Sequence, residues 1–322
     1  MVKHIQLTDY NITPNLSKDI TKELQEIIDE IDGSEDAVLE FSSGFYSLFP
    51  DHARRAIYHI SNTDESNPRR IGLLFQKKQK ITIKGNGATL LCHGRMCPIV
   101  FDECADISVR NLNIDWEHPL GIEAKVIAVQ PKYIDLEIDP IQFPIKIIKG
   151  KLFSAISDPK DKDTTGYRPR RFIDRFIRKF TSDGKVWGVM EFDHETRTIP
   201  PGTGDKSLGW NWVGYRAEQL SESVIRMYKK FPNLPKVGNW LVLRHSPRDH
   251  AGIFIHLCKN ISLSNVNLYA TAGLGIIAQY SGDLSYKKVY IGPNREKRFI
   301  LSGHDDGFHC SNCYGQITSE LC

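Results

Sequence analysis

A sixteen-residue phrase occurs twice in this chain, and its two copies align without a gap. The copies are residues 99–114 (IVFDECADISVRNLNI) and residues 253–268 (IFIHLCKNISLSNVNL), and their alignment places Cys104 on Cys258 at a separation of 154 residues. Both copies alternate apolar and polar residues, which is the pattern of a β-strand with one buried face. An internal repeat of this kind limits the fold to a small number of stacked architectures.

Shorter copies of the phrase flank the two long ones. Residues 80–85 (KITIKG) match residues 106–111 of the first copy at an offset of 26 residues, residues 283–289 (DLSYKKV) match residues 260–266 of the second at an offset of 23, and a weaker copy around Ile317 ends the chain. A unit of this size cannot bury its apolar face alone, but it can when identical units stack. Asn111 and Asn265 fall at turns, where asparagine adopts a left-handed conformation and forms ladders between coils. We therefore predict an all-β protein, a right-handed parallel β-helix of the pectin-lyase-like type; an ordinary β-sandwich with similar strands is the alternative.

One helix is predicted near the N-terminus. Its apolar stripe consists of Ile20, Leu24, Ile27, Ile28 and Ile31, which recur at helical spacing. Ser17 precedes it as the expected N-cap, Asp19 lies in the first turn, and Gly33 ends it. We expect this helix to cap the first coil of the β-helix.

The 154-residue interval between the two long copies contains no clear copy of its own. The alternating segments 122–129 and 133–138 predict a hairpin, residues 185–192 predict another strand, and the basic stretch 163–179 is typical of a solvated face. We therefore expect three parts: a cap with the first coils (residues 1–120), an inserted β-rich, barrel-like subdomain (121–239) and a continuation of the β-helix (240–322).

Composition excludes several classes of protein. The 322 residues have a net charge of only +3, which argues against a nucleic-acid partner, and no apolar run is long enough for a membrane span. The seven cysteines are an odd number at scattered positions, so neither a disulfide framework nor a metal site is expected. The first residues do not resemble a signal peptide.

The segment 303–309 (GHDDGFH) is the first candidate for chemistry. Asp305 and Asp306 are adjacent, lie between glycines and two histidines, and precede a strand phrase, where the mouth of a coil is expected. A neighbouring negative charge and partial burial raise the pKa of one carboxyl group, and a carboxyl group with a raised pKa can act as a general acid. A solvated turn is the alternative for this segment.

Two further segments flank the insertion. Asp115 and Trp116 pair a carboxylate with an aromatic ring, a combination that suits a sugar, although a tryptophan packed at a junction would look the same. Arg244 and Arg248 mark the return into the β-helix and could line the same cleft or pair with carboxylates structurally. The chain has no nucleophile elbow and no phosphate-binding loop.

Five phrases in order along the chain resemble glycoside hydrolase family 110, the α-1,3-galactosidases. They are residues 58–62 (YHISN), 81–88 (ITIKGNGA), 93–96 (HGRM), 113–116 (NIDW) and 306–315 (DGFHCSNCYG), and the last is the most specific. The resemblance implies an inverting glycosidase that needs no metal or other cofactor and carries β-barrel additions on a β-helix. Its implied substrate is a galactose-terminated oligosaccharide or glycoconjugate, of the blood group B type or linear.

The resemblance also assigns residues. The family's general acid falls on Asp306, with His309 and the Asn312-Cys313 pair in register, while Asp305 is an acid that the family pattern does not require. The expected catalytic residues are therefore Asp306 and Asp305, and the expected sugar contacts are Asp115, Trp116, Arg244, Arg248, Gln279 and His309.

The chain departs from the family pattern at its C-terminal end. Family members have two adjacent aspartates one coil further on that are proposed to activate water, and Leu321 replaces a usual asparagine. Inversion needs two carboxylates on opposite sides of the bond. We therefore expect a chain that corresponds to about the first half of an enzyme, with little or no turnover alone, and with an open β-helix end that allows self-association.

Two other functions stay open at this point. One is a non-catalytic glycan-binding or structural β-helix, and the other is a pectin hydrolase like the polygalacturonases, which the Asp-Asp-Gly element vaguely resembles. Members of the resembled family are usually exported, so we expect a periplasmic or extracellular protein, although the first residues of this sequence show no leader.

Overall fold

The computed structural model describes residues 2–33, 35–63, 67–156, 186, 188–204, 207–209, 214–245, 248, 250–297, 300–303 and 305–322. It divides into two compact units. Unit 1 comprises Met1–Glu117, Arg248–Asn294 and Ser302–Cys322, and unit 2 comprises His118–Pro247 and Arg295–Leu301. The sequence pattern did not predict that residues 295–301 belong to unit 2.

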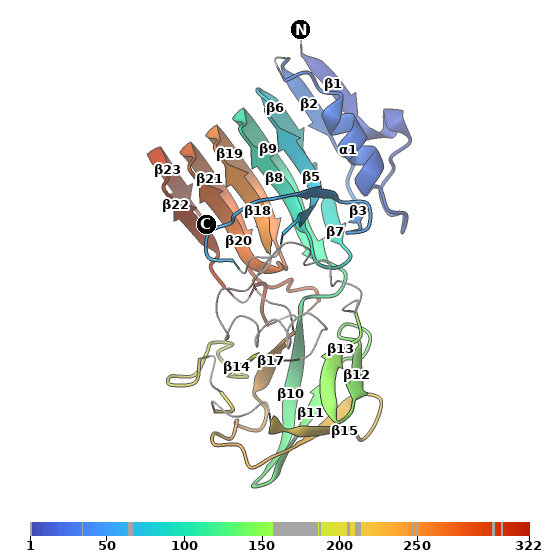
Figure 1. The fold of residues 1–322 in the computed structure, drawn as a ribbon, viewed down its shortest axis with the longest axis vertical. Helices are drawn as coiled ribbons and strands as arrows, with labels where there is room; N and C mark the ends of the chain where they lie inside the picture. The colour runs from blue at the N-terminus through green and yellow to red at the C-terminus, as the bar shows by residue number, and fades with distance from the viewer. Residues whose placement is uncertain are drawn as a thin grey trace. The chain divides into compact units, whose positions relative to one another are not determined.

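Unit 1 is built from two parallel sheets, which we call sheet A and sheet B. Sheet A follows the order β1-β2-β6-β9-β19-β21-β23, with β3 and β7 joined to it through β9. Figure 1 shows these strands in steps from blue β1 to red β23. Their bounds are β1 Lys3–Gln6, β2 Ala37–Glu40, β3 Phe45–Leu48, β6 Ile81–Lys84, β7 Thr89–Cys92, β9 Ala105–Trp116, β19 Lys259–Leu268, β21 Gly282–Ile291 and β23 Tyr314–Glu320.

Sheet B follows the order β22-β20-β18-β8-β5-β4, and all its pairs are parallel except that between β4 and β5. Its strands are β4 Arg54–Ala56, β5 Arg69–Gln76, β8 Cys97–Asp102, β18 His250–His256, β20 Gly273–Gln279 and β22 Phe308–Ser311. The chain alternates between the two sheets coil by coil, so the predicted parallel β-helix is confirmed.

The strand register reproduces the sequence repeat. Ile253 pairs with Ile99 in sheet B, and Leu268 pairs with Ile114 in sheet A, so the 154-residue offset holds along the whole phrase. The 26-residue step reappears where β6 pairs with β9, and the 23-residue step where β19 pairs with β21. Residues that match in the sequence therefore lie side by side in successive coils.

The predicted turn ladders are also present. Asn111 and Asn265 have left-handed backbones, with φ of 54° and 52°, and Asn265 Nδ2 donates to Asn111 Oδ1 at 2.8 Å. Cys104 and Cys258 are both buried and stacked, and the Cys104 amide donates to Cys258 Sγ at 3.3 Å. The insertion leaves no gap in the stack, because the coil after it lies directly on the coil before it.

The predicted helix is α1, Thr21–Asp29, preceded by the short 3-10 helix η1, Leu7–Tyr10. Its buried Gln25 binds both the N–H and the C=O of Leu74 on β5, at 2.7 and 2.9 Å, and so takes the place of a neighbouring strand. The expectation that Ser17 caps the helix is wrong: Asp19 Oδ1 accepts from the Thr21 amide at 2.8 Å.

Unit 2 has a core of its own around an antiparallel sheet of order β14-β17-β10-β11-β16-β15. The predicted hairpin is β10 Gly121–Gln130 with β11 Tyr133–Ile138, and the strand expected at 185–192 is β14 Gly188–Phe192. The others are β15 Arg216–Gln219, β16 Val224–Tyr228, β17 Trp240–Arg244 and a separate hairpin of β12 Ile145–Ile148 with β13 Lys151–Ser154. The basic stretch 163–179 lies outside the described residues. Within the described part of the chain, no helix has the length and apolar character that crossing a membrane requires.

Candidate active site

The loop of residues 57–63 crosses one face of sheet B. Its Tyr58 and Ile60 are buried in an apolar cluster with Val100, Phe254 and Ile277, which are contributed by β8, β18 and β20. These three strand residues stand in one transverse row of the parallel register. The 57–63 loop is therefore anchored on the sheet by hydrophobic burial, and its polar residues are held against the same face.

A buried carboxylate fixes the first part of the 57–63 loop. Asp102 Oδ2 accepts hydrogen bonds from the Tyr58 hydroxyl at 2.9 Å and from Gln76 at 2.8 Å, and Asp102 Oδ1 lies 2.8 Å from His256 Nδ1. Burial alone would raise the Asp102 pKa, but the hydrogen bonds from His256, Gln76 and Tyr58 hold it below its usual value. Burial and the Asp102 charge together raise the pKa of the Tyr58 hydroxyl, which stays a proton donor to Asp102.

Gln279 fixes the second part of the loop. Its Oε1 accepts from the Ser61 amide at 3.0 Å, and its Nε2 donates to the His59 carbonyl at 3.1 Å. The side chain is buried, at 8% exposure. In this structure both ends of the Gln279 amide are occupied by the loop, which does not fit the expected role as a sugar contact.

Four polar side chains meet where the 57–63 loop reaches β22. Asn62 Nδ2 donates to Asp306 Oδ2 at 2.8 Å, and His309 Nδ1 lies 3.1 Å from the same oxygen. The other ring nitrogen of His309 lies 3.1 Å from Ser61 Oγ. The Asp306 side chain remains 47% exposed, so it can be reached by a ligand.

Arg248 and Asp305 extend this cluster. Arg248 Nη1 donates to Asn62 Oδ1 at 3.1 Å and lies 3.7 Å from Asp305 Oδ1. The Asp305 side chain is 15% exposed and that of Arg248 is 42% exposed. The site therefore contains Asp306, Asp305, His309 and Arg248 of the expected residues, and we call these four with Ser61 and Asn62 the acid cluster.

Asp115 and Trp116 lie elsewhere in unit 1 and are buried, at 2% and 0% exposure. Asp115 Oδ1 accepts from the Trp116 amide at 2.8 Å, Asp115 Oδ2 accepts from Asn294 at 3.0 Å, and the indole N–H donates to the Gly94 carbonyl at 2.8 Å. An aromatic ring without exposed area offers no face to a sugar. The packed-tryptophan alternative fits this structure, and the expected sugar contacts do not.

Arg244 belongs to β17 in unit 2 and is 5% exposed. Its guanidinium lies over Gly188 on β14, where an added Cβ would stand 2.7 Å from Arg244 Nε. Gly188 is therefore the residue that makes room for this buried arginine. Its burial favours the structural alternative over a sugar contact.

Ser61 and Asn62 were not among the expected site residues. Both lie in the phrase 58–62 that contributed to the family resemblance, so that phrase was the available signal. Neither residue type marks a site by itself, and the contact between Asn62 and Asp306 joins positions 244 residues apart.

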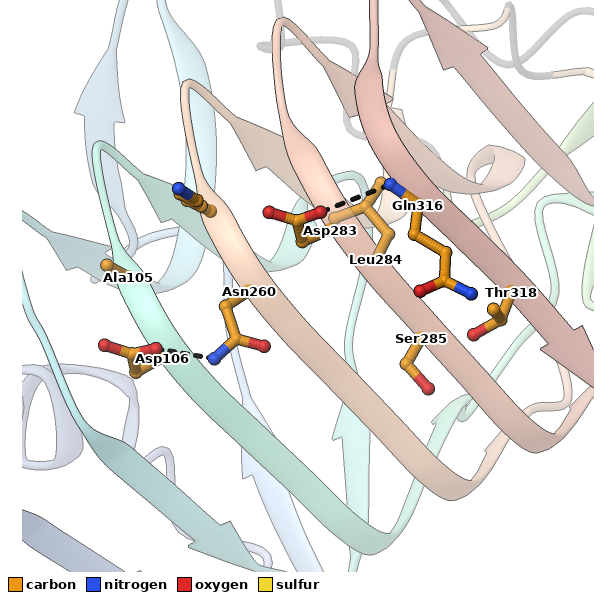
Figure 2. Close-up of a pocket in the computed structure, with 9 residues that line it drawn as sticks. Ala105, Asp106, Asn260, Asp283, Leu284, Ser285, Gln316 and Thr318 are labelled. Carbon is orange, nitrogen blue, oxygen red and sulfur yellow. Dashed lines mark hydrogen bonds between the residues drawn. The ribbon is translucent and has the colours of Figure 1, made fainter.

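A separate depression of about 660 Å³ lies on sheet A, lined by residues of β9, β19, β21 and β23. Figure 2 shows two hydrogen-bonded pairs in this depression: Asn260 Nδ2 donates to Asp106 Oδ1 at 2.5 Å, and the backbone N–H of Gln316 donates to Asp283 Oδ1 at 3.2 Å. These pairs join equivalent turn positions of neighbouring coils. They are part of the ladder that stacks the coils, and they provide matched controls for the acid cluster.

Comparison with known proteins shows which proteins this chain is similar to in sequence. A family model described as GLAA-B beta-barrel domain I matches residues 171–241. Alpha-1,3-galactosidase B of Bacteroides thetaiotaomicron is 35% identical over 99% of this chain and 48% of its own length, and Alpha-1,3-galactosidase A of Bacteroides fragilis is 28% identical over 99% of this chain and 49% of its own. Among solved structures, the Yersinia enterocolitica family 28 exopolygalacturonase matches with a TM-score of 0.37 at 11% identity, over 99% of this chain and 43% of that one.

The chain spans about half the length of the curated relatives it matches. Within that half, the match to the two α-1,3-galactosidases covers nearly all of this chain. By sequence, therefore, this chain is similar over nearly its whole length to curated α-1,3-galactosidases, and the beta-barrel match fits its resemblance to glycoside hydrolase family 110.

Proposed function

We propose that this chain carries the acid half of a site that hydrolyses terminal α-1,3-linked galactose with inversion. The observation that carries the proposal is the acid cluster. An exposed carboxylate, Asp306, is held by an amide and an imidazole on the face of a β-helix whose sequence relatives are named α-1,3-galactosidases. Positioned carboxyl groups are the proton donors that glycoside hydrolysis requires.

Asp306 is the better acid of the two neighbouring aspartates. Its side chain is 47% exposed, whereas that of Asp305 is 15% exposed and faces Arg248. We assign to Asp305 the task of holding Arg248 in place, since breaking such a half-buried ion pair would leave a charge uncompensated. Arg248 is the side chain that we propose to contact galactose hydroxyls beside Asp306, whereas both ring nitrogens of His309 face protein partners, Asp306 and Ser61.

An inverting enzyme also needs a base carboxylate, at roughly 6.5–9.5 Å from the acid. Asp305 is engaged with Arg248, so we propose that neither it nor another described residue of the acid cluster contributes the base. The chain tested alone should then bind a galactose-terminated glycan but release galactose slowly or not at all.

The test measures both binding and galactose release with an α-1,3-galactosyl disaccharide. The chain is compared with Asp306→Asn and with Asp283→Asn, a control on sheet A whose side-chain oxygen can still accept from the Gln316 amide. We expect the unmodified chain to bind the disaccharide and to release little galactose. Asp306→Asn should weaken that binding, and Asp283→Asn should leave it intact. If the unmodified chain releases galactose at a normal rate and Asp306→Asn abolishes that release, the proposal that the base is missing is refuted and the proposed activity is supported.

Two other results would overturn the proposal. Binding without hydrolysis that does not respond to Asp306→Asn would favour a non-catalytic glycan-binding module. Hydrolysis of polygalacturonate, measured as reducing ends, would select the pectin-hydrolase alternative.

A further inference from the structure

Two donors among the described residues reach the Asp306 carboxyl group, and both converge on a single oxygen. Asn62 Nδ2 lies 2.8 Å from Oδ2, and His309 Nδ1 lies 3.1 Å from the same atom. Neither of these bonds uses Oδ1. The two oxygens of Asp306 are therefore in different environments, and only one of them is suited to carry a proton that is free to be transferred.

The orientation of the Asn62 amide follows from its other partner. Arg248 Nη1 lies 3.1 Å from the opposite end of that amide. A guanidinium can only donate hydrogen bonds, so the atom facing Arg248 is the oxygen and the atom facing Asp306 is the NH2 group. Arg248 thus ensures that Asn62 presents a donor to Oδ2.

The tautomer of His309 follows in the same way. An ionised carboxylate only accepts, so the nitrogen that faces Asp306, Nδ1, carries the hydrogen. Nε2 is then the acceptor, and it lies 3.1 Å from the Ser61 hydroxyl, which can donate to it. Ser61 is in turn held by Gln279, whose Oε1 accepts from the Ser61 amide at 3.0 Å.

Resting on the proposed function, we infer that Asn62 and His309 are positioning residues that occupy Oδ2 and leave Oδ1 as the oxygen that protonates the leaving group. In that step the Oδ1–H bond breaks, the proton passes to the glycosidic oxygen, and the bond from that oxygen to galactose breaks. Water, deprotonated by the base carboxylate, supplies the hydroxyl that remains on galactose. The carboxylate left on Asp306 is stabilised by both donors until solvent returns a proton to it.

The first experiment needs no turnover. Histidine-selective ¹⁵N NMR of the 322-residue chain reports which ring nitrogen of His309 carries the hydrogen when the ring is neutral, and the His309→Gln spectrum assigns the signal. We expect the Nδ1–H form in the chain and a mixed population in Asp306→Ala. His52, whose Nδ1 lies 2.6 Å from Asp19 Oδ2, is the internal reference for the same contact away from the site. An Nε2–H form at His309 would overturn the inference.

The second experiment separates positioning of the acid from general damage. On the slow release that the chain retains, Asn62→Ala should lower kcat for an α-1,3-galactosyl disaccharide by about 10- to 100-fold, a part of what a general acid contributes. On a dinitrophenyl α-galactoside it should lower kcat by less than about 3-fold, since that leaving group needs no proton. Asn260→Ala breaks the matching bond to Asp106 on sheet A and should change neither rate (Figure 2).

The outcomes separate the inference from the proposed function. Equal loss on both substrates would overturn the positioning role and leave the galactosidase proposal standing. If the chain hydrolyses neither substrate, as expected where the base is missing, the tautomer of His309 alone decides whether the donors meet Oδ2 as inferred, and an Nε2–H form overturns the inference while glycan binding still tests the proposed function.

Discussion

Glu123 is a buried acid in unit 2 whose titration should govern the stability of that unit. It lies on β10 at 5% exposure, and its Oε1 accepts from the amides of Ile300 and Leu301 at 2.5 and 3.0 Å. Burial raises its pKa from 4.5 to about 7, although both amides and the charge of Arg197 act to lower it. Val242 is the cross-strand partner of Glu123, and Val242 and Ile300 belong to one apolar cluster.

The sign of the effect follows from where the proton is held more tightly. The folded chain retains the Glu123 proton up to pH about 7, whereas the unfolded chain loses it near 4.5. The contribution of protonated Glu123 to the unfolding free energy is therefore fully present below pH 4.5, and it is lost as the pH rises through 7. A difference between pKa values of 4.5 and about 7 corresponds to about 3 kcal/mol of unfolding free energy.

Glu123→Gln isolates that charge. The glutamine oxygen can still accept from the Ile300 and Leu301 amides, but it carries no charge at any pH. We expect the variant to be more stable than the unmodified chain by about 3 kcal/mol at pH 8 and by less than about 1 kcal/mol at pH 5. Urea unfolding followed by pulse proteolysis at the two pH values, with cleavage within β10 and β17 as the readout, measures the difference for unit 2.

Glu137→Gln on the neighbouring strand β11 is the control, because this residue is exposed and its charge is hydrated. It should change the unfolding free energy by less than about 0.5 kcal/mol at either pH. If the unfolding free energies of Glu123→Gln and the unmodified chain differ by the same amount at every pH between 5 and 8, the reasoning is refuted. That result would show that ionisation of Glu123 does not destabilise the folded chain.

Three shorter predictions concern unit 1. Asn265→Ala should cost about 1–2 kcal/mol in urea unfolding, because it removes a ladder bond and places alanine at a φ of 52°, while Asn265→Gly should recover the backbone part. Gln25→Ala should cost about 2 kcal/mol and speed hydrogen exchange at the Leu74 amide, which loses its acceptor; unchanged exchange there would contradict the capping role of α1. Gly275→Ala should weaken binding of galactose-terminated glycans measured by calorimetry, because its Cβ would collide with the Gly307 carbonyl beside Asp306.

The β-helix was predictable because its coils repeat the same local chemistry. Each phrase places apolar residues on one face and a left-handed asparagine at one turn, and such units lower their free energy only when like residues stack on like. The alignment of residues 99–114 with 253–268 therefore contained the register that the strands adopt. The hairpin after Gly121 was predictable for the simpler reason that its strands alternate around a proline turn.

The sequence was misleading, or left two alternatives open, where one residue type serves two structural roles. Ser17 is a good cap by composition, but Asp19 lies nearer the start of α1, and its Oδ1 accepts from the Thr21 amide. Trp116 beside Asp115 has the composition of a sugar site, yet an indole is also the largest apolar side chain, and here its burial dominates. Composition does not distinguish these roles, because they differ only in what surrounds the side chain.

By itself, the sequence determined the stacking of the coils, the presence of an insertion between them, and Asp306 as the acid to examine. Only the tertiary structure decided which polar groups surround that acid. Asn62 reaches Asp306 across 244 residues because the 57–63 loop is laid over sheet B by the burial of Tyr58 and Ile60. Periodicity records which face of a strand is buried, whereas a contact between a loop and a distant turn depends on how the whole coil closes, and no local pattern contains that information.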